Sequence, residues 1–460
     1  MSAEKQHMNI NALVLSLTCS IALVRPLWGL AILLISECTL FGLGSYATVQ
    51  LPIGYAGISD VFVICLLIGA YSHARKKGRS SLQNHKMETC VTLRSAILPY
   101  LIWFAACCLI GIIWGTGGYP ITLLIRHTIA AVLPWSLVVF VWFMRDQVKK
   151  MIKMAIIVAS GTALVHIAIQ LFDMRSWMYA AYWASASGID EYQEYLINEG
   201  DFVRGLPRGI ILMLYCQIFC FSAYLTSKDS LRKNPVFLLL SLLQVIAIGI
   251  TFTRSLMAEA IAGCGLAVVL ASKVGDMRKL VQKKMFGAFF VGVFCLVIIM
   301  AAKPQIFDYW GERVQNLQDD LWIFSTETVR GIDNVASLKA ISDKPLFGWG
   351  MFVYPDAYSF RETHPTDIHP LLEIGLVGGI PCIMLFVYLQ WTVASRFFIN
   401  SRNDMNLRGL MLPYFTVIIT TLLVINTIGA GGTISGPGLI AMALFIGFMA
   451  AEFENAKSVP

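Results

Sequence analysis

The sequence predicts an all-α polytopic membrane protein with about 12 or 13 transmembrane helices and a large outer loop that contains short amphipathic helices. Two observations predict this class. Hydrophobic residues make up 57% of the 460 residues and charged residues 14%, whereas about a quarter of a soluble domain is charged. The apolar residues also form long runs of about 20 residues, the length that a helix needs to cross a bilayer.

The apolar runs give the order of the predicted helices. Arg25 and Pro26 separate the first two runs, which form either a tight hairpin or one span plus an interfacial piece. The first run is expected to be retained, because further spans follow it. The runs lie at about 10–24, 27–46, 57–73, 95–115, 121–143, 152–172, 205–226, 235–251, 255–271, 286–302, 370–395, 409–427 and 434–451.

Clusters of basic residues indicate which loops share a side of the membrane. Lys and Arg concentrate in cytoplasmic loops, so the long acidic segments at about 173–203 and 303–369 are expected on the outer side. The chain then divides into an N-terminal bundle over 1–302, a large outer loop over 303–369 and C-terminal transmembrane helices over 370–460. Topology accounts for the net charge of +7, and we expect no nucleic-acid partner. The clusters lie at 75–79, 145–153, 228–233, 273–284 and 396–408.

One segment of the large loop is predicted to be helical. Between Glu327 and Ile341 the sequence alternates polar and apolar residues at roughly helical spacing. This pattern predicts an amphipathic helix that lies on the membrane face or on other helices, ended by Lys344 and Pro345. Its apolar positions are Val329, Ile332, Val335, Ala336, Leu338 and Ile341.

Arginines at the outer ends of spans are the first candidates for chemistry. A charge inside or beside a span is costly and marks function, and arginine binds phosphate in a forked geometry that lysine cannot reproduce. Arg254 is the most informative, because it occupies a short turn between two apolar runs. The group predicts a lipid phosphate or diphosphate site, unless these arginines extend to headgroups or pair with acids such as Glu259. The other candidates are Arg126, Arg204, Arg208 and Arg330.

Two histidines, His364 and His369, precede the span that begins near Pro370. Histidine suits proton transfer near neutral pH, although a single loop histidine is more often an ordinary surface residue. His166, inside a span, is expected to be a satisfied packing residue. The spacing around His364 and His369 fits no standard set of metal ligands, so we expect neither a metal nor another cofactor.

A series of motifs in this region resembles the O-antigen ligase/polymerase family of bacterial envelope glycosyltransferases. The resemblance covers about 200–380 and is most specific over 311–379. It implies His364 as the catalytic histidine, although Pro365 follows it where the family commonly has Asn. Arg254 resembles the second essential arginine, and either Arg204 or Arg208 the first. The motifs are Glu312-Arg313, Arg330, Lys344-Pro345-Leu346-Phe347-Gly348-Trp349-Gly350, His364 and Glu373-Ile374-Gly375-Leu376-Val377-Gly378.

The resemblance implies a metal-independent transferase of the bacterial inner membrane with its active site facing the periplasm. Such an enzyme moves a glycan from undecaprenyl diphosphate to an acceptor hydroxyl, with arginines stabilising the leaving diphosphate. In this reading His364, Arg254 and Arg208 are catalytic. Arg204, Arg126, Arg330, His369 and Glu373 bind substrate.

The acceptor stays open at this point. The family includes polymerases that extend a repeat unit, transferases to a pilin or other protein hydroxyl, and ligases to lipid A-core. Acidic outer loops repel a phosphorylated acceptor, which favours the first two, and a chain-length regulator is a candidate partner. A transporter or flippase of lipid-linked sugars is the competing class. It would place its charges near the membrane midplane and show matching halves, and we find no such halves.

Overall fold

A computed structural model describes residues 3–39, 48–51, 54–77, 88–113, 121–172, 209–226, 234–251, 253–273, 278–315, 329–351, 369–401, 404–426 and 436–457. Within these ranges the protein is a bundle of helices, and one antiparallel hairpin of two short strands is the exception. Seven of the helices are long and apolar enough to cross a membrane, and five shorter apolar helices accompany them. The prediction of an all-α polytopic membrane protein is confirmed.

The helices follow the predicted apolar runs closely. The N-terminal part contains α1 (Ala3–Val24), α2 (Pro26–Glu37), β1 (Thr48–Leu51), β2 (Gly54–Gly57), α3 (Ile58–Lys76), α4 (Glu88–Ile113), α5 (Ile121–Val132), η1 (Leu133–Trp135), α6 (Ser136–Phe143), η2 (Arg145–Gln147) and α7 (Val148–Leu171). The rest contains α10 (Ile210–Thr226), α11 (Asn234–Ile250), α12 (Arg254–Ser272), α13 (Arg278–Ala302), α14 (Gln305–Gln315), α16 (Val329–Asp343), α17 (Pro370–Asn400), α18 (Met405–Thr420), η5 (Thr421–Ile425) and α20 (Gly436–Lys457).

Two predicted runs differ in detail. The run over 121–143 is divided into α5 and α6 by a short 3₁₀ turn at Pro134, because proline has no N–H to continue the helix. The described helix of the second run ends at Glu37, and residues 40–46 of that run lie outside the described residues. The helices α1 and α2 contact each other across the single residue Arg25, and α2 is a short helix of 12 residues, so the hairpin and the interfacial piece both stay open.

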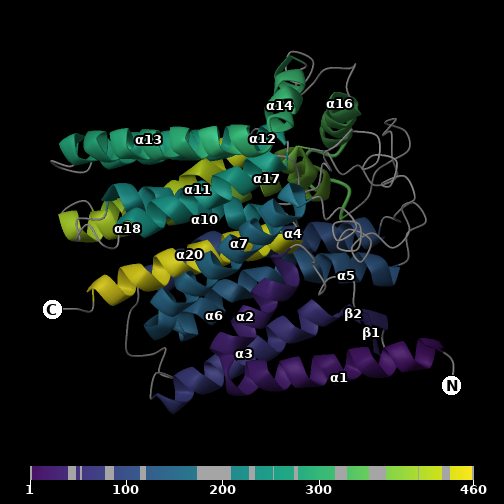
Figure 1. Ribbon diagram of the computed structural model, residues 1–460. Helices are drawn as coiled ribbons and strands as arrows, with labels where there is room; N and C mark the ends of the chain where they lie inside the picture. Colours follow the sequence, from purple (N-terminus) through teal and green to yellow (C-terminus); the bar gives the residue numbers. More distant parts are fainter. Residues whose placement is uncertain are drawn as a thin grey trace.

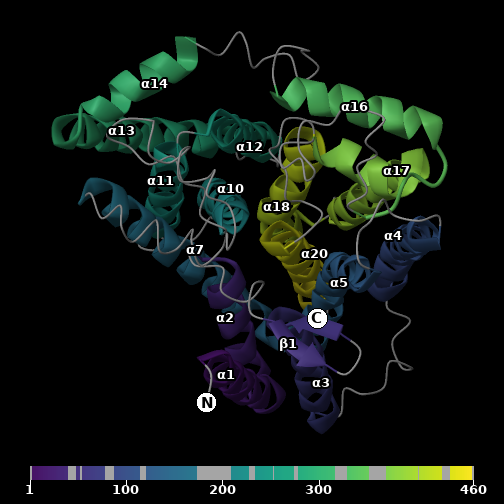
Figure 2. The same cartoon turned by 90° about the vertical axis from the view of Figure 1, so that its right-hand side faces the viewer.

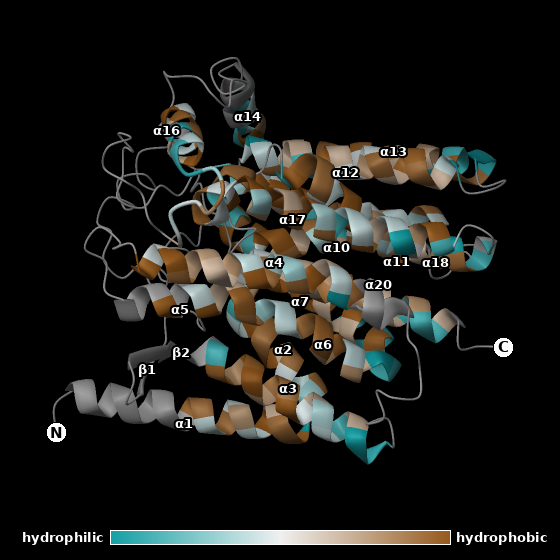
Figure 3. Ribbon diagram, turned by 180° about the vertical axis from the view of Figure 1, so that it is seen from behind, coloured by the Kyte–Doolittle hydropathy of each residue, from teal (hydrophilic) through white to brown (hydrophobic). Residues whose placement is uncertain are grey.

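The long helices run side by side and define two ends of the bundle (Figure 1). The helices α14 and α16, the start of α12 and the start of α17 lie at one end, which we call the α16 end (Figures 1 and 2). The opposite end, which we call the basic end, contains the end of α3 and the starts of α7, α13 and α18. Hydrophilic residues gather there while the lengths of the helices are largely apolar (Figure 3). The described residues of the predicted clusters at 75–79, 145–153, 273–284 and 396–408 belong to this end, whereas the cluster at 228–233 lies outside the described residues.

The helix α10 forms the centre of the bundle. All its residues are buried apart from Ala223 and Thr226, which are half-buried. It packs against α7, α11, α12 and α18. Its polar side chains reach neighbouring helices, as a low-dielectric interior requires. The Gln217 Nε2 atom donates to Ser241 Oγ at 3.4 Å, and the hydroxyls of Ser222 and Thr416 are 3.3 Å apart.

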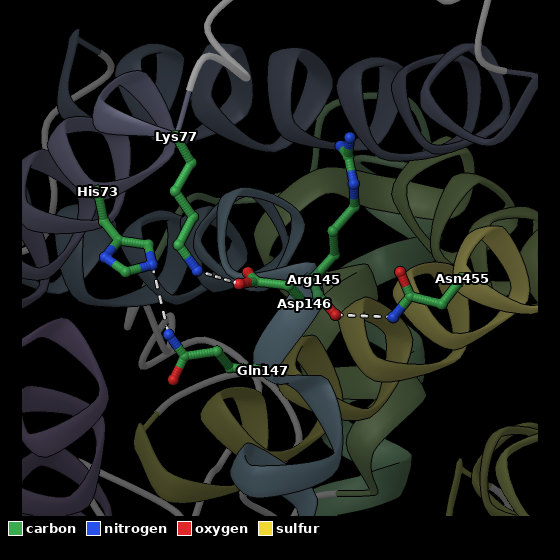
Figure 4. Close-up of polar contacts among 6 residues, drawn as sticks. All are labelled: His73, Lys77, Arg145, Asp146, Gln147 and Asn455. Carbon is green, nitrogen blue, oxygen red and sulfur yellow. Dashed lines mark hydrogen bonds and ion pairs between the residues drawn. The ribbon is translucent and has the colours of Figure 1, made fainter. Parts of the chain in front are cut away.

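Polar contacts tie three elements together at the basic end (Figure 4). Lys77, after α3, forms an ion pair of 2.5 Å with Asp146 in η2. In the same place Gln147 Nε2 lies 3.3 Å from His73 Nε2. The Asn455 side chain in α20 donates to the backbone oxygen of Arg145 at 2.7 Å. The turn between α6 and α7 is thus held from both sides.

One lysine of the basic clusters has a structural role that the sequence did not reveal. Lys284 in α13 is buried, with 8% of its surface exposed. Its Nζ atom donates to the backbone oxygens of Tyr224 at 2.6 Å and Leu225 at 3.2 Å. These carbonyls lie in the last turn of α10, where they lack helical partners and where a cation is favourable. Lys284 therefore caps the central helix.

Replacement of Lys284 by Met is expected to lower the free energy of unfolding by roughly 1.5–3 kcal/mol, because two buried carbonyls lose a charged donor. Thermal unfolding in detergent measures the change. The adjacent Lys283 is exposed and serves as the matched control. Equal behaviour of Lys284→Met and Lys283→Met would show that the cap contributes nothing.

Candidate functional site

The helix α17, which begins at Pro370, is broken at Gly378 and Gly379, after its first eight residues. Gly379 has φ 69° and ψ −170°, a conformation that essentially only glycine adopts. Pro381 has no N–H, so the carbonyl of Val377 cannot receive its usual helical hydrogen bond. The break separates a short N-terminal half of α17, which carries Glu373, from the long transmembrane half. It leaves backbone groups that need partners.

The segment 344–350, which we call the clasp, supplies those partners. It follows α16 directly and lies against the break in α17. Three backbone groups of α17 around the break are thereby satisfied by backbone of the clasp rather than by their own helix. The three hydrogen bonds are Trp349 N to Leu376 O at 2.6 Å, Gly350 N to Val377 O at 3.1 Å and Ile380 N to Pro345 O at 2.7 Å.

Two glycines make this close approach of backbones feasible. Gly348 has φ 62° and Gly350 has φ 94°, values that favour glycine. A Cβ atom at Gly348 would lie 2.5 Å from the oxygen of Leu376. One at Gly350 would lie 2.9 Å from the Cα atom of Gly111 in α4. The motif that suggested the family therefore has a physical basis here, because its glycines let the clasp contact α17 and α4.

Aromatic residues fix the clasp on both sides. The indole N–H of Trp349 donates to Ala340 O in α16 at 2.8 Å, and the Nζ atom of Lys344 lies 3.6 Å from the centre of its ring. Partial burial lowers the pKa of Lys344. From α4, Trp103 stacks on Phe347 with ring centres 5.4 Å apart and donates to Gly378 O at 2.9 Å. The clasp thus joins α4, α16 and α17.

The helix α16 is confirmed, and its buried face differs from the predicted set of apolar positions. Leu338, expected to be covered, is 43% exposed. Three polar residues are instead buried, each with at most 2% of its surface exposed: Asp333, Asn334 and Ser337. The neighbouring Ala336 is also buried. The helix α16 packs on α17, where Ala340 and Ile341 cluster with Leu372 and Leu376, so its buried face follows this contact and not apolar periodicity alone.

The junction of α16 and α17 contains two of the predicted site residues. His369 is buried, and its backbone N–H donates to the Oδ1 atom of Asn334 at 2.9 Å. Its carbonyl accepts from Glu373 N at 3.0 Å, so His369 is the N-cap residue of α17. Glu373 lies in the first turn, where the helix dipole favours negative charge.

Arg254 is the first residue of α12 and is half-buried. The preceding residue, Thr253, is extended and buried, and its hydroxyl donates to Thr251 O at 3.3 Å. The indole of Trp310 in α14 donates to Gly249 O at 3.2 Å, just before this turn. The prediction of a charged turn between two apolar helices is confirmed. A guanidinium at a helix N-terminus, where the helix dipole is positive, is suited to anions.

The remaining predicted residues are described in part. Arg126 is in α5 and Arg330 is in α16, but their side chains lie outside the description. His364, Arg204 and Arg208 lie outside the described residues altogether. At the α16 end the structure therefore contains Arg254 and the α16–α17 junction, with His369, Glu373 and the backbone of Arg330 (Figure 2).

Several buried polar residues differ from expectation or were not foreseen. His166 is fully buried as predicted, but neither ring nitrogen has a hydrogen-bond partner among the described residues, so it is not a satisfied packing residue there. Glu259 is buried in α12 and lies near Tyr215 of α10. Asn334 was missed because its role depends on a contact with α17, which no local pattern encodes.

Among the described residues, no group of three or more His, Cys, Asp or Glu is arranged to hold a metal ion. At the α16 end the described residues include Arg254, His369 and Glu373. Side chains of these types are suited to binding an anion and hydroxyl groups. Comparison with protein-family models gives no match, and neither does comparison with curated proteins.

Proposed function

We propose that the protein is a glycosyltransferase of the bacterial inner membrane. It moves a glycan from undecaprenyl diphosphate to an acceptor hydroxyl on the periplasmic side, and its principal reaction is the polymerisation of O-antigen or related polysaccharide repeat units. The observation that carries the proposal is the position of Arg254. It begins α12 at the same end of the bundle as the clasp and the N-terminus of α17.

The chemistry needs little beyond these groups. Diphosphate is a good leaving group, and the guanidinium of Arg254 together with the N-terminus of α12 neutralises the charge that grows on it as the glycosidic bond breaks. His364 accepts the proton of the attacking hydroxyl as general base. Arg208 or Arg204 supplies the second cation, and Arg126, Arg330, His369 and Glu373 contact the substrate.

The family resemblance gains support from the clasp. The motif Lys344–Gly350 and the motif Glu373–Gly378, separated by 22 residues in the sequence, pair through backbone hydrogen bonds at the break in α17. Two motifs that contact each other are expected to serve one site. The experiment below decides whether that site transfers sugar.

A purified-protein assay tests the proposal. The protein in detergent is mixed with undecaprenyl-diphosphate-linked glycan extracted from the membranes of its own cells, without ATP or an ion gradient. Growth of the glycan on the lipid is expected, and His364→Ala is expected to abolish it while leaving membrane insertion intact. Transfer by His364→Ala at the wild-type rate would contradict the assignment of the base.

The same assay separates the alternatives. Addition of a pilin or of lipid A-core shows whether a protein Ser or Thr, or lipopolysaccharide, is the acceptor in place of a repeat unit. A flippase of lipid-linked sugars is the competing class, and it is favoured by ionisable residues buried within spans, Glu259 and His166. A flippase forms no glycosidic bond, so movement of the lipid across the bilayer of vesicles that contain the purified protein, without any product, would replace the proposal.

A further inference from the structure

The clasp contacts α4 well inside that helix and not only at its end. At Gly111, close to the last residue of α4, a Cβ atom would lie 2.8 Å from the Cα atom of Gly350. Eight residues earlier in α4, Trp103 stacks on Phe347 with ring centres 5.4 Å apart. A helix rises about 1.5 Å per residue, so the two contacts are separated by about 12 Å along α4.

This stretch of α4 belongs to a candidate membrane span. The span runs over Leu93–Ile113, and Trp103 is at its middle. The hydrocarbon core of a bilayer is about 30 Å thick, so Phe347 contacts α4 far below the membrane surface. The N-terminal half of α17 reaches the same level, because Trp103 also donates to Gly378 O at 2.9 Å.

The polar groups of the clasp are suited to this depth. Irregular backbone is stable within a bilayer only where its polar groups are bonded inside the protein. The N–H groups of Trp349 and Gly350 and the carbonyl of Pro345 are hydrogen-bonded to α17, and Gly348 N donates to Lys344 O at 3.0 Å. The Nζ atom of Lys344, the one ionisable group of the clasp, lies 3.6 Å from the centre of the Trp349 ring.

The clasp also presents an apolar surface. Leu346 is 59% exposed, and Phe347 is exposed beside it. The backbone of Leu346 lies against the break, since a Cβ atom at Gly379 would be 2.6 Å from its oxygen. The next part of α17 exposes Ile380 and Met384, within the candidate span Pro370–Asn400. The apolar surface of the clasp thus adjoins the side of α17 that faces lipid.

We propose that the clasp is a re-entrant element. It enters the bilayer from the α16 end, and Leu346 and Phe347 contact the acyl chains of phospholipids in the leaflet on that side. An exposed apolar patch marks a contact with a protein or a membrane, and the adjoining surface of α17 identifies lipid as the occupant. The inference does not depend on the transfer reaction.

Spin labels on introduced cysteines test this position. The full-length variants Leu346→Cys, Met384→Cys and Ser342→Cys are labelled and placed in vesicles of phosphatidylethanolamine and phosphatidylglycerol. Met384 represents the lipid-facing side of α17, and Ser342 is an exposed polar residue in the last turn of α16. Collisions of each label with oxygen, which dissolves in hydrocarbon, are compared with collisions with a water-soluble nickel chelate. Wild-type protein treated with the same label gives the background from native cysteines.

The ratio of oxygen to nickel collisions at residue 346 is expected to be several-fold higher than at residue 342 and close to that at residue 384. A label at 346 that meets the nickel chelate as often as the label at 342 would place the clasp in water. A label at 346 shielded from both reagents would show that protein covers it. Either result overturns the inference.

A second measurement uses the wild type and needs no substitution. An apolar diazirine dissolved in the bilayer loses nitrogen on illumination, and the resulting carbene inserts into C–H bonds of side chains that contact lipid. Mass spectrometry is expected to find the added group on Leu346 or Phe347 as well as on Met384. Modification of Met384 with none on residues 345–347 would contradict the re-entrant position.

Discussion

Replacement of Arg254 by Ala is expected to lower glycan transfer by about 10²-fold or more, the effect of removing one donor that stabilises developing negative charge. The side chain begins α12 and is half-buried, so it acts in surroundings less polar than water. The initial rate of transfer by purified protein measures the loss.

Arg254→Lys is expected to recover little of this activity, because an ammonium group cannot make the forked contact with a diphosphate. Arg278 provides a matched control, since it is also the first residue of a helix but is exposed at the basic end. Arg278→Ala is expected to retain full transfer. A lysine variant at Arg254 as active as the wild type would reduce the role of this residue to a simple positive charge.

Replacement of Gly379 by Ala is expected to disrupt the attachment of the clasp to α17 and to lower both stability and transfer. The backbone at Gly379 has a conformation that costs other residues roughly 1–3 kcal/mol. In addition, a Cβ atom there would lie 2.6 Å from the carbonyl carbon of Leu346, with the oxygen of Pro345 still closer. Thermal unfolding in detergent and the transfer assay measure the two effects.

Gly265 in α12 is the control for this substitution, because a Cβ atom there would meet nothing within 4 Å. An alanine at this helical position is expected to be neutral or to stabilise by roughly 0.5–1 kcal/mol. If Gly379→Ala unfolded at the same temperature as Gly265→Ala and transferred glycan normally, the clasp would not be needed to hold α17.

The fold was largely accessible from the sequence, because long apolar runs permit few alternatives in a bilayer. The turn at Arg254 and the end of α16 before Lys344 both follow from local signals that the structure reproduces. The sequence also contains the residues that break α17, Gly379 and Pro381. Hydropathy alone predicts that this segment is a single continuous span.

The contacts between helices that form the candidate site could not be predicted from the sequence. Asn334 binds His369 and Trp103 binds Gly378, and each pair is distant in the sequence. The exposed Leu338 shows the same limit, because helical periodicity cannot tell which face of a helix a neighbouring helix will cover. Lys284 resembled a topology signal, and its burial depends on where α10 ends.

A structure of the protein with undecaprenyl diphosphate bound tests the central claim most directly. We expect the diphosphate at the α16 end, with its oxygens about 2.7–2.9 Å from the guanidinium of Arg254 and the α16–α17 junction facing the same ligand. A diphosphate bound at the basic end, or at the α16 end without contact to Arg254, would contradict the account.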